Sequence, residues 1–171
     1  MAGTNKRNKL ISNGPCIILK EPQLQENIGM CARSMLNYGL SDLRIVNPKK
    51  AFPDERAISA SAGAFDKIMK NTRVFSNFEE AMKSIDILFA TSVRIRDLEK
   101  NILTPREAIK FIIKKYKYSK IGFLFGPEKA GLNNTDLSEA NFIIQIPTNP
   151  SFGSLNLATV SYTHLRAHET Y

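Results

Sequence analysis

The chain has 171 residues, enough for one domain that buries roughly two thirds of its unfolded surface, so folding requires neither disulfides nor a structural metal. Twenty-four Lys and Arg against sixteen Asp and Glu give a net charge of +8, which favours a polyanionic partner but is a weak signal alone. No stretch is apolar for long enough to span a membrane or act as a signal peptide, which predicts a cytoplasmic protein.

The chain begins with a short basic segment, residues 1–14, which carries Lys6, Arg7 and Lys9. We expect a flexible arm there, and a specific contact with RNA is the alternative. Residues 15–158 are expected to form the folded domain.

Short apolar runs alternate with segments of helical periodicity along that domain. The runs at 16–19, 43–46, 85–90, 121–125 and 142–146 are predicted to be strands. Paired prolines predict a loop at 47–53. The alternation predicts an α/β domain with a largely parallel sheet flanked by helices.

The first predicted helix follows the first strand. Its apolar residues recur at helical spacing, and Gly39 stands where a left-handed C-cap belongs. Arg33 lies off the apolar stripe, which consists of Ile28, Cys31, Ala32, Met35 and Leu36. Asn27 either caps this helix or contacts RNA. Cys31 and Cys16 are expected to be buried, inert thiols.

Two later helices are predicted from their caps. Asn77 with Glu80 predicts a helix reaching about Ser84. Thr104 and Glu107 form a capping box, and this helix should reach Lys117. Its outer side carries Arg106, Lys110, Lys114 and Lys117, which either contact tRNA phosphates or form a solvated face.

A glycine-rich turn at 126–131 directly follows a predicted strand. Leu132 and Asn133 stand where a phosphate-binding loop would have Lys and Ser or Thr, which excludes an NTPase. No Gly-x-Gly-x-x-Gly follows a strand, which argues against a dinucleotide-binding fold. The turn falls at the carboxyl edge of the sheet, where open α/β folds place ligands.

Three segments occur in a fixed order: 26–29 with Arg33, then 125–132, then 146–156. That order resembles the SPOUT class of RNA methyltransferases, in its 2'-O-ribose branch. The stretches 52–55 and 62–64, 90–94 and 154–158 are most similar to the TrmJ type of tRNA methyltransferase. The resemblance spans about 15–158.

The resemblance implies a C-terminal trefoil knot that binds S-adenosylmethionine, in a protein that is normally a homodimer. It implies cofactor contacts, many through backbone atoms, at Thr91, Ser92, Val93, Gly126, Ile146, Gly153, Ser154 and Leu155. The two prolines at 147 and 150 give the last of these loops a stiff, extended start.

The resemblance also assigns the chemistry. Arg33 would activate the ribose hydroxyl together with a substrate phosphate, and Gly29, one turn earlier, would leave room for the RNA. Glu128, Ser154 and Asn156 would organise the cofactor and ribose pocket, whereas a loop-stabilising carboxylate and a helix cap are the structural alternatives. Asn27 and Arg33 are the expected RNA contacts.

The implied activity is S-adenosylmethionine-dependent 2'-O-methylation of a tRNA ribose at nucleotide 32. The same chemistry on the wobble nucleotide or on rRNA, and a non-catalytic RNA-binding module, are the alternatives. The tail at 159–171 departs from the family: it resembles translated adapter sequence, and it replaces the final knot helix and the C-terminal extension. His164 and His168 lack a third ligand, so no metal site is predicted.

Overall fold

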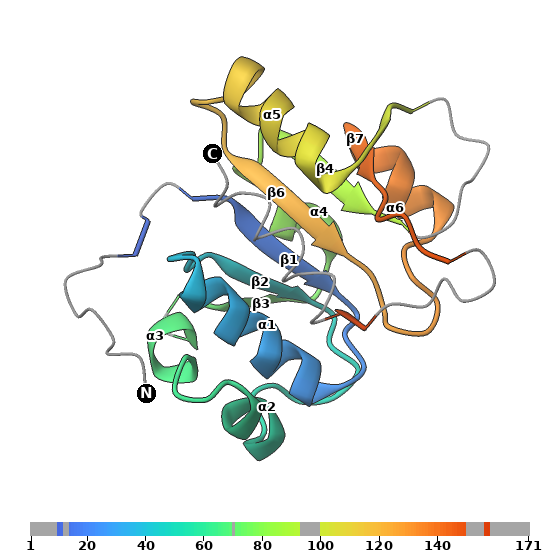
Figure 1. Ribbon diagram of the computed structural model, residues 1–171. Helices are drawn as coiled ribbons and strands as arrows, with labels where there is room; N and C mark the ends of the chain where they lie inside the picture. The colour runs from blue at the N-terminus through green and yellow to red at the C-terminus, as the bar shows by residue number, and fades with distance from the viewer. Residues whose placement is uncertain (1–9, 12–13, 70, 93–99, 150–155, 158–171) are drawn as a thin grey trace.

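A computed structural model describes residues 10–11, 14–69, 71–92, 100–149 and 156–157 (Figure 1). Its centre is one seven-stranded sheet in the order β3-β2-β1-β6-β4-β7-β5, and every pairing is parallel. The strands are β1 Cys16–Lys20, β2 Leu43–Val46, β3 Arg73–Phe75, β4 Ile87–Thr91, β5 Ile102–Leu103, β6 Ile121–Phe125 and β7 Phe142–Ile144.

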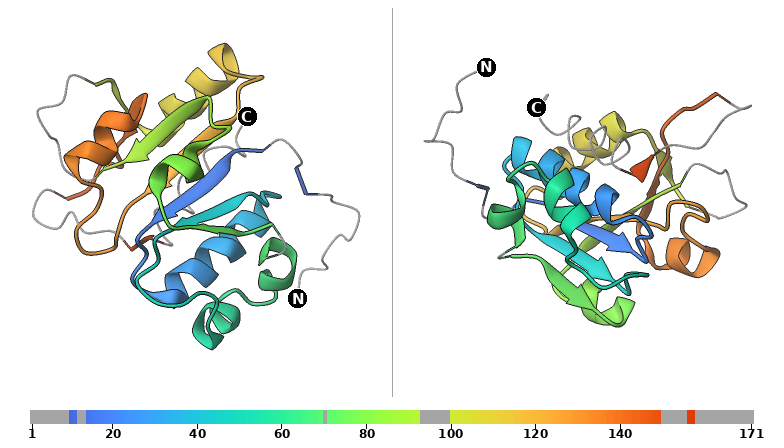
Figure 2. Two further views of the ribbon diagram at one scale, coloured as in Figure 1. Left: turned by 180° about the vertical axis from the view of Figure 1, so that it is seen from behind. Right: turned by 90° about the horizontal axis from the view of Figure 1, so that it is seen from below.

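Helices cover both faces of the sheet. They are α1 Gln25–Asn37, α2 Glu55–Ala60, α3 Phe65–Met69, α4 Phe78–Met82, α5 Pro105–Lys115 and α6 Asn134–Glu139. The cores show that α1, α3 and α5 pack on one face and α4 and α6 on the other. Figure 1 shows α1 and α5 in front of the sheet, and the rear view in Figure 2 brings α4 forward. The predicted α/β class is confirmed.

The central strands supply side chains to both cores. In β1, Ile17 and Leu19 join the core under α1, whereas Cys16 and Ile18 join the core under α4 and α6. A parallel strand buried on both faces has no polar side, which is why β1 and β6 stand out as unbroken apolar runs. Cys16 and Cys31 are buried, as predicted, and neither is part of a disulfide. Burial raises the pKa of Cys16 far above its usual range.

The order of the strands decides where a site can form. β6 inserts between β1 and β4, and β7 inserts between β4 and β5. Four loops that are far apart in the sequence therefore start side by side at the carboxyl edge, after β1, β6, β4 and β7. Ligands in open α/β sheets bind at such an edge.

All five predicted strands exist, but several predicted boundaries are wrong. β4 starts at Ile87 rather than Ile85, because Ser84 adopts a φ of 73° and Ile85 is still part of the turn. β7 stops at Ile144, two residues early. The helix after Asn77 ends at Met82, since Lys83 is already extended at φ −52° and ψ 134°.

The predicted helix caps are largely confirmed. α1 ends in a Schellman motif, in which Gly39 has a φ of 73° and Leu40 N–H donates to Met35 O at 2.9 Å. Thr104 and Glu107 form the capping box of α5. This helix ends at Lys115, not Lys117. Asn27 is not a cap: the N-cap of α1 is Leu24, which offers no side-chain oxygen.

The opposite, amino edge of the sheet is tied together by Asp42. Its carboxylate pairs with Lys120 at 3.0 Å, Arg73 at 3.2 Å and Arg44 at 3.4 Å. Arg44 is 1% exposed and also donates to Lys83 O at 2.9 Å. Burial alone would raise the pKa of Asp42, but the hydrogen bonds from Lys120 and Arg44 outweigh it and bring this pKa to about 2.

The C-terminal knot and the tail at 159–171 lie outside the described residues, so both stay predictions. Leu157 is described, and it is buried in the core under α1. In the described part of the chain, no helix combines the length and the apolar character that crossing a membrane requires.

Candidate functional site

Glu128, in the loop after β6, reaches across to the start of α1. Its carboxylate accepts hydrogen bonds from Gln23 N at 2.8 Å, Leu24 N at 3.1 Å and Asn27 Nδ2 at 3.0 Å. A negative charge at this end is also favoured by the helix dipole. Because Leu24 cannot cap α1 with its own side chain, the glycine-rich loop supplies the acceptor from 101 residues away.

Asn156 extends this network to the third segment. Its Nδ2 donates to Asn27 Oδ1 at 3.1 Å, so the Asn27 amide bridges Glu128 on one side and Asn156 on the other. Asn27 itself is only 2% exposed. The three segments singled out in the sequence thus meet through one chain of side-chain hydrogen bonds.

The glycine loop is shaped by close backbone approach. A Cβ on Gly126 would lie 2.5 Å from Leu132 N and 2.6 Å from Gly131 C, so only glycine fits. Gly131 has a φ of 67° and donates its N–H to Pro127 O at 2.8 Å. The loop therefore folds back on itself directly after β6 and holds Glu128 toward α1.

The predicted cofactor residues that are described follow three neighbouring strands. Thr91 ends β4, Gly126 follows β6 and Ile146 lies just past β7; β4 pairs with both of the other strands. Thr91 Oγ1 donates to Leu124 O at 3.0 Å, and Ser92 N donates to Ile144 O at 3.0 Å. These bonds hold the three strand ends together at one edge of the sheet.

Arg33 is not part of the hydrogen-bond network. It lies on α1 six residues beyond Asn27, roughly 9 Å along the helix axis, and is exposed. No ion pair of Arg33 occurs within the described residues. A charged guanidinium held in solvent is available to a phosphate.

Gly29 does not serve the purpose that the sequence suggested. A Cβ at this position would lie 2.2 Å from the carbonyl oxygen of Ala57 and 3.0 Å from the Ala60 side chain. The space beside Gly29 is filled by α2, not left open for RNA. The expectation of an approach route at Gly29 is wrong, and its physical role is the close crossing of α1 and α2.

Sequence reasoning missed Gln25, which is 1% exposed in the first turn of α1. Its Nε2 donates to Ala51 O at 3.2 Å and Lys50 O at 3.4 Å, which fixes the loop after β2 against α1. The available signal was its position next to Glu26 and Asn27 in the first motif. The ion pair of Lys20, at the end of β1, with Asp136 of α6 was also missed.

Four predicted cofactor residues, Val93, Gly153, Ser154 and Leu155, lie outside the described residues, as do His164 and His168. No group of three or more His, Cys, Asp or Glu side chains suited to a metal occurs in the described ranges. The described site is therefore built from neutral backbone edges, two asparagines and one carboxylate.

Residues 14–162 match the model of the SpoU rRNA Methylase family. The chain belongs to this family. A relative, the tRNA (cytidine/uridine-2'-O-)-methyltransferase TrmJ of Sodalis glossinidius, is 41% identical over 83% of this chain and 55% of its own length. An uncharacterized tRNA/rRNA methyltransferase of Haemophilus influenzae is 40% identical over 83% of this chain and 57% of its own length.

A solved structure agrees with this fold. The crystal structure of TrmJ from Z. mobilis ZM4 superposes with a TM-score of 0.85 at 42% identity and covers 92% of this chain and 69% of that one. The resemblance to the TrmJ type is thus confirmed. The chain spans little more than half the length of the curated relatives that it matches.

Proposed function

We propose that this protein transfers a methyl group from S-adenosylmethionine to a ribose 2'-hydroxyl of tRNA. The observation that carries the proposal is the network of Glu128, Asn27 and Asn156, which joins three distant segments beside the carboxyl ends of β4, β6 and β7. Membership of the SpoU rRNA Methylase family supports it, as does the net charge of +8.

The residues at the three strand ends fit the cofactor. Thr91, Ser92, Gly126 and Ile146 present backbone groups and no charged side chain, which suits a ligand whose adenine is read by N–H and C=O groups. Together with Val93, Gly153, Ser154 and Leu155 they would hold S-adenosylmethionine. When bound, it supplies a methyl group on a sulfonium whose leaving thioether is neutral.

The protein's task lies with the nucleophile, because a ribose 2'-hydroxyl is a poor acid that must be aligned and stabilised as its proton leaves. We assign this role to Arg33, whose guanidinium can clamp a neighbouring substrate phosphate with paired hydrogen bonds. Arginine stays protonated in proteins, so the proton passes to another group. Glu128 and Asn156 position the loops around the methyl-transfer site.

The proposed target is nucleotide 32 of the tRNA anticodon loop, and the proposed setting is the cytoplasm, where the protein works as a homodimer. Support for a subunit contact comes from exposed apolar side chains on α1 and α2: Leu24, at the N-cap of α1, Met30 and Ile58 are 48%, 37% and 46% exposed.

The test is to map 2'-O-methylated nucleotides in RNA from cells with and without the gene. Loss of the methyl group at tRNA nucleotide 32 alone is the expected result. Loss at the wobble nucleotide or in rRNA would retain the chemistry but refute the target. An unchanged map, with tRNA binding intact in vitro, would favour a non-catalytic binding module.

A further inference from the structure

The end of α5 and the turn after it carry a cluster of cations and one exposed aromatic ring. We call Lys114, Lys115, Lys117 and Tyr118 the α5 basic end. All four are exposed, and Tyr118 is 93% exposed. None of the three lysines forms an ion pair within the described residues.

The stability of the helix does not account for this cluster. Lysines in the last turn of a helix interact favourably with the helix dipole, which explains Lys114 and Lys115. Lys117 and Tyr118 come after the helix has ended. The only acid between residues 103 and 119 is Glu107, and its carboxylate accepts two hydrogen bonds of 2.8 Å from Thr104 in the capping box. A carboxylate from elsewhere in the chain, that of Asp86, lies near this turn, where it accepts a hydrogen bond from Lys120 N at 2.6 Å. Within the described residues, Asp86 forms no ion pair with the lysines of the α5 basic end.

The arrangement of the ring and its neighbours matches a nucleic-acid contact. Lys117 Nζ lies 5.8 Å from the Tyr118 ring centroid, so a cation stands beside an open aromatic face. Lysine ammonium groups bind phosphates as point charges, and exposed aromatic rings stack on unpaired bases. A solvated helix face would account for the charged side chains, but it would not account for a large aromatic side chain exposed to water.

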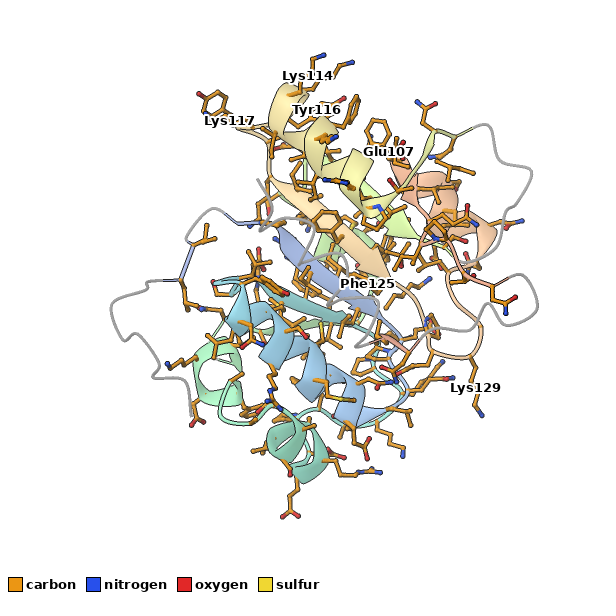
Figure 3. The ribbon with its side chains drawn as sticks, in the orientation of Figure 1. Glu107, Lys114, Tyr116, Lys117, Phe125 and Lys129 are labelled. Atoms are coloured by element: carbon orange, nitrogen blue, oxygen red, sulfur yellow. The ribbon has the colours of Figure 1, made fainter. Side chains whose placement is uncertain are left out.

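The α5 basic end lies far from the proposed methyl-transfer site. α5 leads into the amino end of β6, whereas Glu128 and Gly126 follow its carboxyl end. A five-residue strand spans about 16 Å, which sets the scale of the separation. Figure 3 shows Lys114 and Lys117 at the top of the molecule and Lys129, the residue after Glu128, at its lower right, with Phe125 between them in this view.

We propose that the α5 basic end is a second RNA-binding surface, which holds the substrate outside the target loop by its phosphates and by one unpaired base on Tyr118. The inference rests on the proposed function for the identity of the RNA. When an isolated anticodon stem-loop binds at the carboxyl edge, its reacting nucleotide lies about one strand length from the α5 basic end. An intact tRNA extends beyond the stem-loop and can contact both surfaces.

The test compares two double variants with the same change in net charge. Lys114→Gln/Lys117→Gln removes two charges from the α5 basic end, and Lys67→Gln/Lys83→Gln removes two exposed lysines elsewhere. Filter binding across a salt series measures the affinity of each variant for intact tRNA and for an isolated anticodon stem-loop. Thermal unfolding verifies that each variant is folded.

We expect the α5 variant to bind intact tRNA about tenfold more weakly at low salt. The slope of log K against log salt concentration should decrease in magnitude by about 1 to 2, because each lost phosphate contact contributes roughly 0.7 to 0.9. Its affinity for the stem-loop should change less than twofold. Tyr118→Ala should weaken tRNA binding at least fivefold, while Tyr118→Phe, which retains the ring, should not.

Equal losses in the two double variants would overturn the proposal, because long-range charge alone would then explain binding. An equal loss for the stem-loop and the intact tRNA would also overturn it, since the α5 basic end would then serve the target loop itself. The readout is binding, so absence of methyl transfer would refute the proposed function without altering this comparison.

Discussion

At the scale of single residues, the candidate site depends on Asn27. Asn27 is 2% exposed, and its side-chain amide donates through nitrogen to Glu128 and accepts through oxygen from Asn156. The sequence pointed to Glu128 and Asn156 through family resemblance, and to Asn27 as either a helix cap or an RNA contact. Their contact could not be predicted from spacing, because Glu128 is 101 residues and Asn156 129 residues from Asn27, and only the strand order brings them together.

We predict that Asn27 and Glu128 are energetically coupled. In a double-mutant cycle of Asn27→Ala and Glu128→Ala, the coupling free energy of unfolding should be about 1 kcal/mol or more, because a carboxylate hydrogen bond is lost in each single variant. Denaturant unfolding measures it. The same cycle with Lys129→Ala, at the exposed neighbouring position, should be additive. Additivity for Glu128 as well would mean that the contact contributes nothing.

At the scale of elements, long apolar runs and caps were predictable and short elements were not. β1, β2 and β6 were found because both of their faces are buried. β3 and β5 were missed, since they have three and two residues and are largely exposed. α2, α3 and α6 have five or six residues, too few to show a helical period, although Asn133 and Asp136 do form a capping box.

The close crossing of α1 and α2 predicts that a Gly→Ala change in α1 lowers stability, although the same change usually stabilises a helix. Gly→Ala inside a helix ordinarily stabilises by about 0.5 to 1 kcal/mol. Gly29→Ala should instead destabilise by about 1 to 3 kcal/mol, because the new Cβ would meet Ala57 O at 2.2 Å. Chemical denaturation gives the value. Asn37→Ala, exposed on the same helix, should change stability by less than about 0.5 kcal/mol. A stabilising Gly29→Ala would contradict the close packing.

At the scale of the whole molecule, the two edges of the sheet have separate roles. The carboxyl edge gathers the loops of the candidate site, and the amino edge is fastened by Asp42 with its three cations. Composition and charge predicted one basic domain but gave no hint of this division, because it follows from the order in which β6 and β7 insert into the sheet.

The Asp42 cluster predicts how stability depends on pH. The pKa of Asp42 falls from 3.8 in the unfolded reference to about 2 in the folded protein, so the folded state favours the ionised carboxylate. Its contribution, about 1 to 2 kcal/mol after allowance for solvent screening, is present above pH 4 and is lost as pH falls through 2. Asp42→Asn should weaken the dependence of the unfolding free energy on pH between about pH 2 and 4. Glu139→Gln, at an exposed site, should leave this dependence unchanged. An unaltered pH profile in Asp42→Asn would refute the assignment.

The central claim is that Arg33, outside the hydrogen-bond network, serves the ribose while the three strand-end loops hold the cofactor. The most direct measurement is single-turnover transfer of radiolabelled methyl groups to tRNA by Arg33→Ala, with S-adenosylmethionine affinity measured by calorimetry on the same sample. We predict that transfer falls by at least a thousandfold while cofactor affinity changes less than threefold, as expected for loss of a positioned catalytic group. Transfer at the parent rate, or cofactor binding lost together with transfer, would contradict it.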